Sequence, residues 1–164
     1  MIIREIAKSE IGFLKEMLYD AIFVEEGQPK LPKFIIEEPS LAKYITNFGS
    51  NEYDLCLVAV ENEELIGACW GRIFDEYNKG YGFLDTETPE LSIAVKEQHR
   101  NKGIGTKLIY NIAEYYSGLN IKTLSLSVDK KNLAIGLYKK IGFTTMKETE
   151  KSVVMRLELS SDGI

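Results

Sequence analysis

The chain has 164 residues, of which 45% are hydrophobic and 27% are charged, and its formal net charge is −5. This length and composition are those of an ordinary globular domain, so we expect residues 1–164 to form a single domain. The longest clean apolar run, Leu55 to Val60, is too short to span a membrane. Charged residues interrupt the N-terminus where a signal peptide would be apolar. We therefore expect a cytoplasmic protein without a membrane partner.

Two cysteines and one histidine limit the available chemistry. Cys56 and Cys69 lie in apolar runs and form no zinc pattern, so we expect buried, reduced thiols and no metal. Residues 1–95 hold eight Lys or Arg against eighteen Asp or Glu, whereas residues 96–164 hold twelve against seven. The basic part suits a small anion and the acidic part a cation, and the acidity disfavours nucleic acid as a partner. Such an asymmetry also arises by chance on solvated surfaces.

The first third of the chain predicts a strand and two helices separated by a loop with prolines. Periodicity and capping residues place these elements, in order, at Met1–Ala7 (strand), Ile11–Phe23 (helix), Gly27–Pro39 (loop) and Ser40–Phe48 (helix). We expect Ser9 and Ser40 to cap the two helices and Gly49 to end the second one.

The middle of the chain predicts a hairpin, an irregular segment with several glycines and a short strand. These elements are, in order, Asp54–Val60, Leu65–Phe74, Asn78–Pro89 (irregular) and Glu90–Val95. The polar run Glu61–Glu64 provides the hairpin turn. Alternation along the last strand places Glu90 with Ser92 and Ala94, opposite the larger apolar side chains of that strand.

The last third of the chain predicts two helices and three strands. These are, in order, Gly103–Tyr116 (helix), Lys122–Val128 (strand), Leu133–Ile141 (helix), and the strands Phe143–Thr149 and Val153–Leu159. Gly142 is placed to end the second of these helices. The whole order predicts an α/β (α+β) domain with a mixed sheet and about four helices.

The most informative segment joins the strand Glu90–Val95 to the helix that follows it. Its turn is basic and holds Gly103 and Gly105 at the start of the helix. Glycines there let the backbone approach a ligand, and the unpaired amides of a helix N-terminus favour an anion. The residues indicate a phosphate-binding turn, although a turn that merely needs glycine has the same pattern. It is neither a P-loop nor a G-x-G-x-x-G fingerprint, since Leu108 stands where the third glycine would be.

Two motifs in this part of the chain resemble one protein family. Arg100-x-x-Gly103-x-Gly105 resembles the pyrophosphate-binding motif of the GNAT superfamily of acyl-CoA-dependent N-acyltransferases. Further along, the chain is similar to a second signature of that family at Asn132, Ala134, Leu137, Tyr138, Gly142 and Phe143. The resemblance covers residues 90–143 and implies a GNAT-like fold with a mostly antiparallel sheet. It also implies an N-acetyltransferase that uses acetyl-CoA.

The resemblance implies a binding site for acetyl-CoA beside the strand Glu90–Val95. Ile93 and Val95, with Ala94 between them, would offer backbone groups to the pantetheine arm, as in strand addition. This arrangement requires the strand to splay from its neighbour. The amides facing the pyrophosphate would be those of Arg100, Asn101, Lys102, Gly103, Ile104, Gly105 and Thr106. Asn132 matches the asparagine that contacts the pantetheine arm.

Tyr138 matches the tyrosine that serves as general acid in many members of the family. A phenol with a pKa near ~10 can protonate a departing thiolate, although an aromatic packing residue would fit the same pattern. The attacking amine needs a base, and many members place a carboxylate at the start of this strand, where Glu90 lies. Asp85 and Glu87 are alternative bases, and Glu90 could instead be a solvated strand end.

Several other residues have less specific roles. Cys56 and Cys69 would be inert in apolar strands, so we expect direct transfer in a ternary complex rather than an acyl-cysteine. Trp70 and Arg72 are candidates to line the acceptor pocket, although Trp70 suits the core equally well. We expect His99 to be an exposed turn residue.

The sequence predicts acetyl transfer to a primary amine of a small cationic molecule or of a peptide or protein. The alternative is a non-catalytic acyl-CoA-binding regulatory module that keeps the phosphate-binding turn but does not catalyse acetyl transfer. Acylation of RNA-borne amines is a third possibility, which the acidic N-terminal part disfavours. A monomer and a homodimer are both compatible with the sequence.

Overall fold

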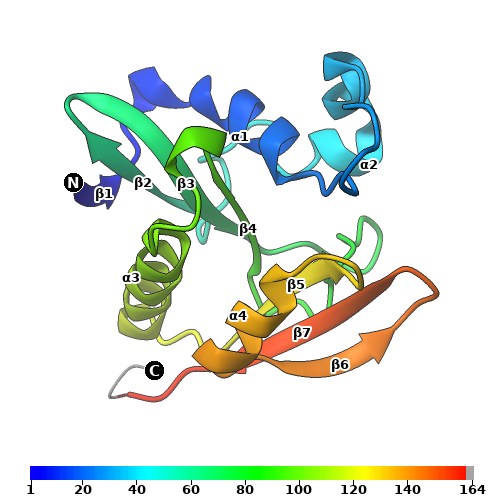
Figure 1. The fold of residues 1–164 in the computed structure, drawn as a ribbon. Coiled ribbons are helices and arrows are strands. Elements are labelled where there is room, and N and C mark those ends of the chain that lie inside the picture. Colours follow the sequence, from blue (N-terminus) through cyan, green and yellow to red (C-terminus); the bar gives the residue numbers. More distant parts are fainter. Residues whose placement is uncertain (162–164) are drawn as a thin grey trace.

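A seven-stranded sheet forms the centre of the computed structural model, which describes residues 1–161 (Figure 1). The strands are β1 (Ile2–Glu5), β2 (Leu55–Glu61), β3 (Glu64–Arg72), β4 (Glu90–Val95), β5 (Thr123–Asp129), β6 (Thr144–Glu148) and β7 (Ser152–Glu158). Their order across the sheet is β1-β2-β3-β4-β5-β7-β6. All neighbours are antiparallel except β4 and β5. The predicted mixed, mostly antiparallel sheet is therefore confirmed.

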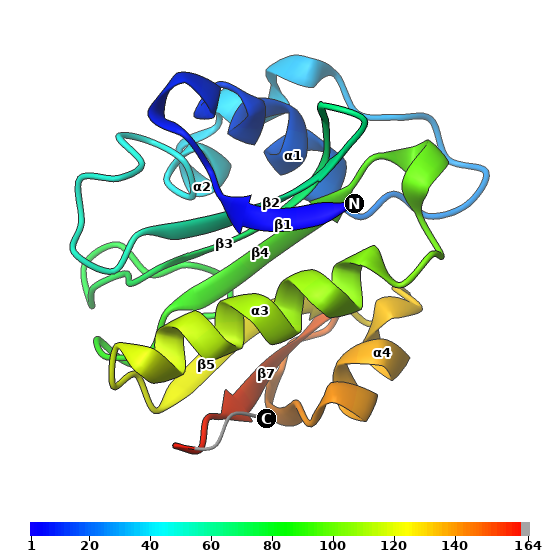
Figure 2. The ribbon, with the colours of Figure 1, turned by 90° about the vertical axis from the view of Figure 1, so that its left-hand side faces the viewer.

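Helices cover both faces of this sheet (Figures 1 and 2). The α-helices are α1 (Phe13–Ala21), α2 (Pro39–Ala42), α3 (Ile104–Gly118) and α4 (Ala134–Ile141). Three 3-10 helices, at Lys8–Glu10, Lys33–Glu37 and Glu97–His99, add to the predicted order of elements without changing it. None of the helices in residues 1–161 combines the length and apolar character of a membrane span.

The sheet separates two hydrophobic cores, as alternation along the strands requires. Leu57, Cys69 and Leu91 contribute to the core under α3 and α4. Their strand neighbours Trp70 and Ala94 contribute to the core under α1. The face on which a side chain of β4 lies therefore decides which helix layer it contacts.

The first helix is shorter than the pattern predicts. The carboxylate of Glu10 accepts hydrogen bonds from the Ala7 amide at 2.8 Å and from Arg4 at 2.8 and 2.9 Å. These local bonds stabilise a 3-10 helix, Lys8–Glu10, that precedes the α-helix in the chain. Ser9 lies inside this 3-10 helix and does not cap the α-helix as predicted. The α-helix then begins at Phe13, after Gly12.

The second helix is also shorter than predicted, and the cause is tertiary. It covers Pro39–Ala42, with Pro39 at its first position, so Ser40 lies within the helix and does not cap it. The chain continues as turns up to Gly49, where φ is 99°. Arg72 donates hydrogen bonds to the carbonyls of Lys43 and Thr46. These carbonyls thus accept hydrogen bonds from a side chain of β3 instead of from the backbone amides that would continue the helix.

Candidate functional site

The predicted site residues gather around a divergence of β4 from β5. These strands are joined by one register pair, Glu90 with Ser125, and Ser125 N donates to Pro89 O at 3.0 Å. Beyond this pair, no described strand hydrogen-bonds to β4 along its remaining length on the β5 side. The splay that the resemblance requires is present in the structure.

Alternate residues of β4 direct their backbone N–H and C=O groups toward this opening. Lys96 N donates to Ile66 O at 2.8 Å, next to the end of the β3–β4 ladder. Since antiparallel partners alternate between bonded and non-bonded pairs, Ile93 and Val95 direct their N–H and C=O groups away from β3. Arg100 Nε donates to Val95 O at 2.9 Å, so this carbonyl is already engaged. Ile93 keeps its groups without a strand partner on that side.

The glycine turn opens beside the same stretch of β4. Asn101 and Gly103 both have positive φ, at 60° and 79°. Lys107 N donates to Gly103 O at 3.1 Å, and the four amides before Lys107 make no such backbone bond within the described chain. A Cβ atom on Gly105 would meet Ile93 Cδ1 at 3.6 Å. The turn therefore presents free amides and open space next to Ile93.

The remaining residues of the turn differ in exposure. Arg100, Asn101 and Lys102 are exposed, and Thr106 is half-buried. Ile104 is 5% exposed and packs in the core under α3, so its side chain is structural and only its backbone amide is left for a ligand.

Tyr138 lies on the α4 side of the sheet. Its side chain belongs to the core under α3 and α4, and its ring packs on Phe143 with centroids 5.8 Å apart. Burial, with a smaller contribution from the Cys69 thiol, raises the pKa of Tyr138 to about 12. The hydroxyl makes no hydrogen bond to any of residues 1–161. Tyr138 is thus a packed ring whose protonated hydroxyl is free to donate.

Asn132 has a clear local role. Its Oδ1 accepts a hydrogen bond from Ala134 N at 2.9 Å, at the start of α4. This bond satisfies one of the first amides of the helix. The side-chain oxygen is therefore engaged, and the amide nitrogen is the group left for a ligand.

Glu90 is a buried carboxyl rather than a solvated strand end. It is 4% exposed and accepts a hydrogen bond from the Tyr44 hydroxyl through Oε2. Its Oε1 has no hydrogen-bond partner of good geometry among the described residues. Burial raises the pKa of Glu90 to about 7, while the Tyr44 hydroxyl, the Gly82 amide and the charge of Lys43 act in the opposite direction. At neutral pH this group is poised to gain or lose a proton.

Sequence reasoning missed Tyr44 and the two glycines that close on Glu90. A Cβ on Gly80 would overlap Glu90 Oε1, and one on Gly82 would lie 3.0 Å from Glu90 Cδ and 2.8 Å from Leu126 C. The spacing Gly80-x-Gly82 was a local signal for close packing. Nothing near Tyr44 in the sequence indicates its partner.

Arg72 and Trp70 do not line an open pocket. The Arg72 side chain is 6% exposed and pairs with Asp54, with an Nη2–Oδ2 distance of 2.8 Å. Trp70 is 1% exposed, and its Nε1 donates to Tyr44 O at 3.2 Å. Both side chains fix the segment after α2, so Trp70 takes the core position that the sequence also allowed, and neither side chain is open to an acceptor in this structure.

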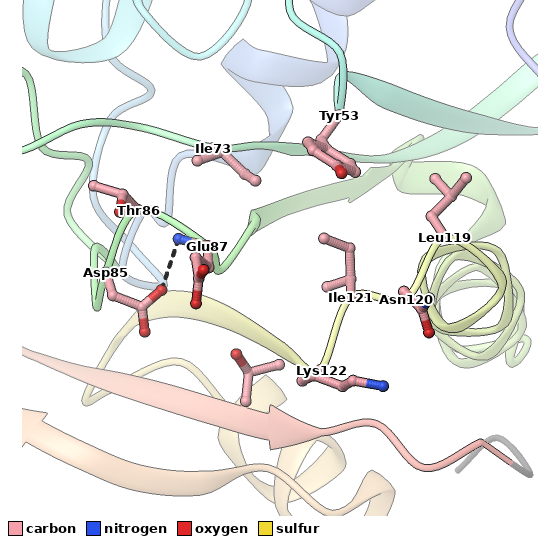
Figure 3. A pocket seen from close by; sticks show the side chains of 10 residues that line it. Tyr53, Ile73, Asp85, Thr86, Glu87, Leu119, Asn120, Ile121 and Lys122 are labelled. Atoms are coloured by element: carbon pink, nitrogen blue, oxygen red, sulfur yellow. Dashed lines mark hydrogen bonds between the residues drawn. The ribbon is translucent and has the colours of Figure 1, made fainter.

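The alternative bases lie elsewhere. Asp85 and Glu87 are exposed and border a pocket of about 420 Å³ at the start of β5 and the end of α3 (Figure 3). Lys122 and Asn120 lie on its other side. This pocket lies beyond the joining pair of Glu90 and Ser125, on the side away from the glycine turn. The two carboxylates are thus poorly placed for chemistry beside Ile93.

The thiols are buried as predicted. Cys56 and Cys69 are both free and buried, and burial raises the pKa of each thiol. His99 differs from its prediction as an exposed residue, since its side chain is 17% exposed and its Nδ1 lies 3.6 Å from Glu61 Oε2. In residues 1–161 no cluster of three or more His, Cys, Asp or Glu could hold a metal ion.

Comparison with known proteins identifies the family. The model of the acetyltransferase (GNAT) family matches residues 16–143, which include β4, the glycine turn and Tyr138. The chain belongs to the GNAT family. It is accordingly an N-acetyltransferase.

Curated relatives agree with this GNAT assignment. The thialysine N-epsilon-acetyltransferase of Mus musculus is 30% identical over an alignment of 164 positions, which covers 95% of this chain and 91% of that protein. An uncharacterized N-acetyltransferase of Bacillus subtilis is 40% identical over 70 residues, or 42% of this chain. The match spans 26% of the length of that bacterial protein.

A solved structure supports the fold. The PaiA N-acetyltransferase of Thermoplasma acidophilum, determined in complex with coenzyme A, has a TM-score of 0.71 to this chain. The match covers 96% of this chain and 98% of that one at 22% identity. The predicted GNAT fold is confirmed.

Proposed function

We propose that the chain, as one catalytic unit, transfers an acetyl group from acetyl-CoA to a primary amine by direct attack. The observation that carries this proposal is the divergence of β4 from β5 beside the glycine turn. The free groups of Ile93 would pair with the pantetheine arm, and the amides of residues 103–106 would receive the pyrophosphate. The amide nitrogen of Asn132 is available for the same arm. Arg100 would need to release Val95 O if that carbonyl is also used.

Glu90 and Tyr138 divide the proton chemistry. The amine nitrogen forms a bond to the thioester carbonyl carbon, and the carbon–sulfur bond breaks. Glu90 takes the amine proton on Oε1 through a water molecule, because this oxygen is buried, and later returns the proton to solvent. Tyr138 gives its proton to the departing sulfur and is reprotonated from solvent. The products are the acetylated amine and the thiol of coenzyme A.

The acceptor that fits best is a small cationic amine or a peptide amine. Residues 1–95, which build β1 to β4 and the layer of α1 and α2, carry the excess of acidic residues. Such a surface attracts a protonated amine electrostatically. The murine relative is named for acetylation of the epsilon nitrogen of thialysine, which supports this class of acceptor.

A turnover assay on a panel of amines tests the proposal. The purified chain is incubated with acetyl-CoA and, separately, a polyamine, an aminoglycoside, lysine or a peptide, and the release of free thiol is followed. We expect release that depends on the amine and favours cationic acceptors. A strong preference for anionic acceptors would contradict the acceptor class. Binding of coenzyme A without turnover on any amine would instead favour the regulatory module.

A further inference from the structure

The backbone around Tyr44 is fixed from both sides by side chains of β3. Arg72 Nη1 donates to Lys43 O at 2.8 Å and to Thr46 O at 2.7 Å. Between these two anchors, Tyr44 O accepts the hydrogen bond from Trp70 Nε1. The peptide groups that carry Tyr44 therefore cannot shift without breaking buried hydrogen bonds.

Arg72 is itself held rigidly. Its Nε and Nη2 donate to the two carboxylate oxygens of Asp54 at 3.0 and 2.8 Å. The Asp54 side chain is completely buried. A bidentate pair of this kind fixes the orientation of the guanidinium plane. Asp54 and Arg72 thus form a rigid support for the segment that places Tyr44.

The proton of the Tyr44 hydroxyl has one direction available. Tyr81 N donates to the Tyr44 hydroxyl oxygen at 2.8 Å, so that oxygen acts as the acceptor toward Tyr81. The hydroxyl hydrogen is then free to point at Glu90 Oε2, its other close partner. Burial raises the pKa of Tyr44 well above its usual value, so the phenol keeps this hydrogen at any working pH.

Few ionisable groups face Glu90 apart from this phenol. Lys43 acts on it from the segment after α2, and Arg72 is its register partner on β3 but is engaged by Asp54. Ser125, its partner on β5, is fully buried and offers a hydroxyl that has no hydrogen-bond partner in the described part of the chain. The loop that holds Gly82 contributes a backbone amide.

We propose that Tyr44 is a positioning residue that holds Glu90 through Oε2, favours its ionised form and leaves Oε1 to accept the proton of the acceptor amine. The inference rests on the proposed role of Glu90 as general base. A hydrogen bond donated to a carboxylate stabilises the charged form, whereas the protonated carboxyl gains less from it. Loss of the hydroxyl should therefore make Glu90 harder to ionise in the folded protein.

The test compares the pH dependence of kcat/KM in Tyr44→Phe and in the wild type. We expect the acidic limb of Tyr44→Phe to move to higher pH by about one pKa unit or more, with activity largely recovered above the limb. The substituted ring would keep the edge contact that Tyr44 makes with Phe74, at 5.0 Å between centroids, so it should stay in place. Tyr116→Phe is the matched control, because it removes another buried phenol hydrogen bond, to Tyr53 O, and its limb should not move.

A second variant and the base itself complete the experiment. Site-specific 3-fluorotyrosine at position 44 makes the phenol a stronger donor without changing its shape, and it should move the limb to lower pH. An unmoved limb in both Tyr44 variants, with Glu90→Gln inactive, would overturn the role of Tyr44 and leave the base assignment intact. A Glu90→Gln variant as active as the wild type would overturn the base assignment, and the role of Tyr44 with it.

Discussion

Glu90 and Tyr138 lie on opposite faces of the sheet, on either side of the divergence between β4 and β5. Glu90 bonds to Tyr44 in the layer of α1 and α2, whereas Tyr138 packs in the core under α3 and α4. A thioester held between the strands would have a base on the side of the entering amine and an acid on the side of the leaving sulfur. In the proposed reaction, this separation would keep the two proton transfers apart.

Tyr138→Phe tests the general acid. The variant keeps the ring that packs on Phe143 and loses only the hydroxyl. We expect kcat to fall by about 10²-fold or more, as for loss of a general acid, while the affinity for acetyl-CoA is retained. Steady-state kinetics with thiol detection measures both quantities. Tyr110→Phe, at an exposed position of α3, is the control, and unchanged turnover in Tyr138→Phe would remove the assignment.

The sequence predicted the part of the site that is built from neighbouring residues. The bounds of β4 match the prediction, because strand alternation and the glycine turn are local patterns. Tyr44 and Glu90 are 46 positions apart, and no local pattern signals their contact. The same holds for α2, where a capping serine and a terminal glycine predicted a helix that continues to Phe48 instead of ending at Ala42. Arg72 donates hydrogen bonds to the carbonyls of Lys43 and Thr46, which are 29 and 26 positions away in the sequence, and these bonds override the local preference.

Glu90→Gln should change how stability depends on pH. The folded protein holds the Glu90 proton up to a pKa of about 7, whereas the unfolded chain loses it near 4.5. Wild-type stability therefore falls as the pH rises between these values, by about 3 kcal/mol at most. Glutamine does not titrate in this range. The free energy of unfolding of the variant, relative to that of the wild type, should therefore rise by this amount between pH 4.5 and about pH 8. Urea unfolding at the two pH values measures the gain, and parallel behaviour of the two proteins would refute it.

Asp54→Ala should be strongly destabilising. It leaves the buried Arg72 guanidinium without its carboxylate partner, which typically costs about 3–5 kcal/mol. Arg4→Ala is the control, since Arg4 pairs with Glu10 at the surface and its loss should cost less than about 1 kcal/mol. Denaturant titration gives both free energies of unfolding. Equal, small losses in the two variants would mean that the buried pair does not support the segment after α2.

Replacement of both cysteines tests the absence of an acyl-enzyme. Because burial raises the pKa of Cys56 and Cys69, neither thiol should react with a thiol reagent in the folded protein. The double variant Cys56→Ala, Cys69→Ala should acetylate amines at close to the wild-type rate. Covalent labelling of the folded protein by acetyl-CoA at either cysteine, found by mass spectrometry, would contradict direct transfer.

Binding of coenzyme A at the glycine turn is the central claim, and isothermal calorimetry on Gly105→Val tests it most directly. A Cβ atom at this position would meet Ile93 Cδ1 at 3.6 Å, an ordinary contact with the flexible end of a side chain, so we expect the fold to tolerate valine. Gly136→Val is the matched control, since a Cβ at this helical position contacts nothing within 4 Å. We predict binding heat for the wild type and the control and none for Gly105→Val. Equal binding by all three proteins, or by none of them, would contradict the account.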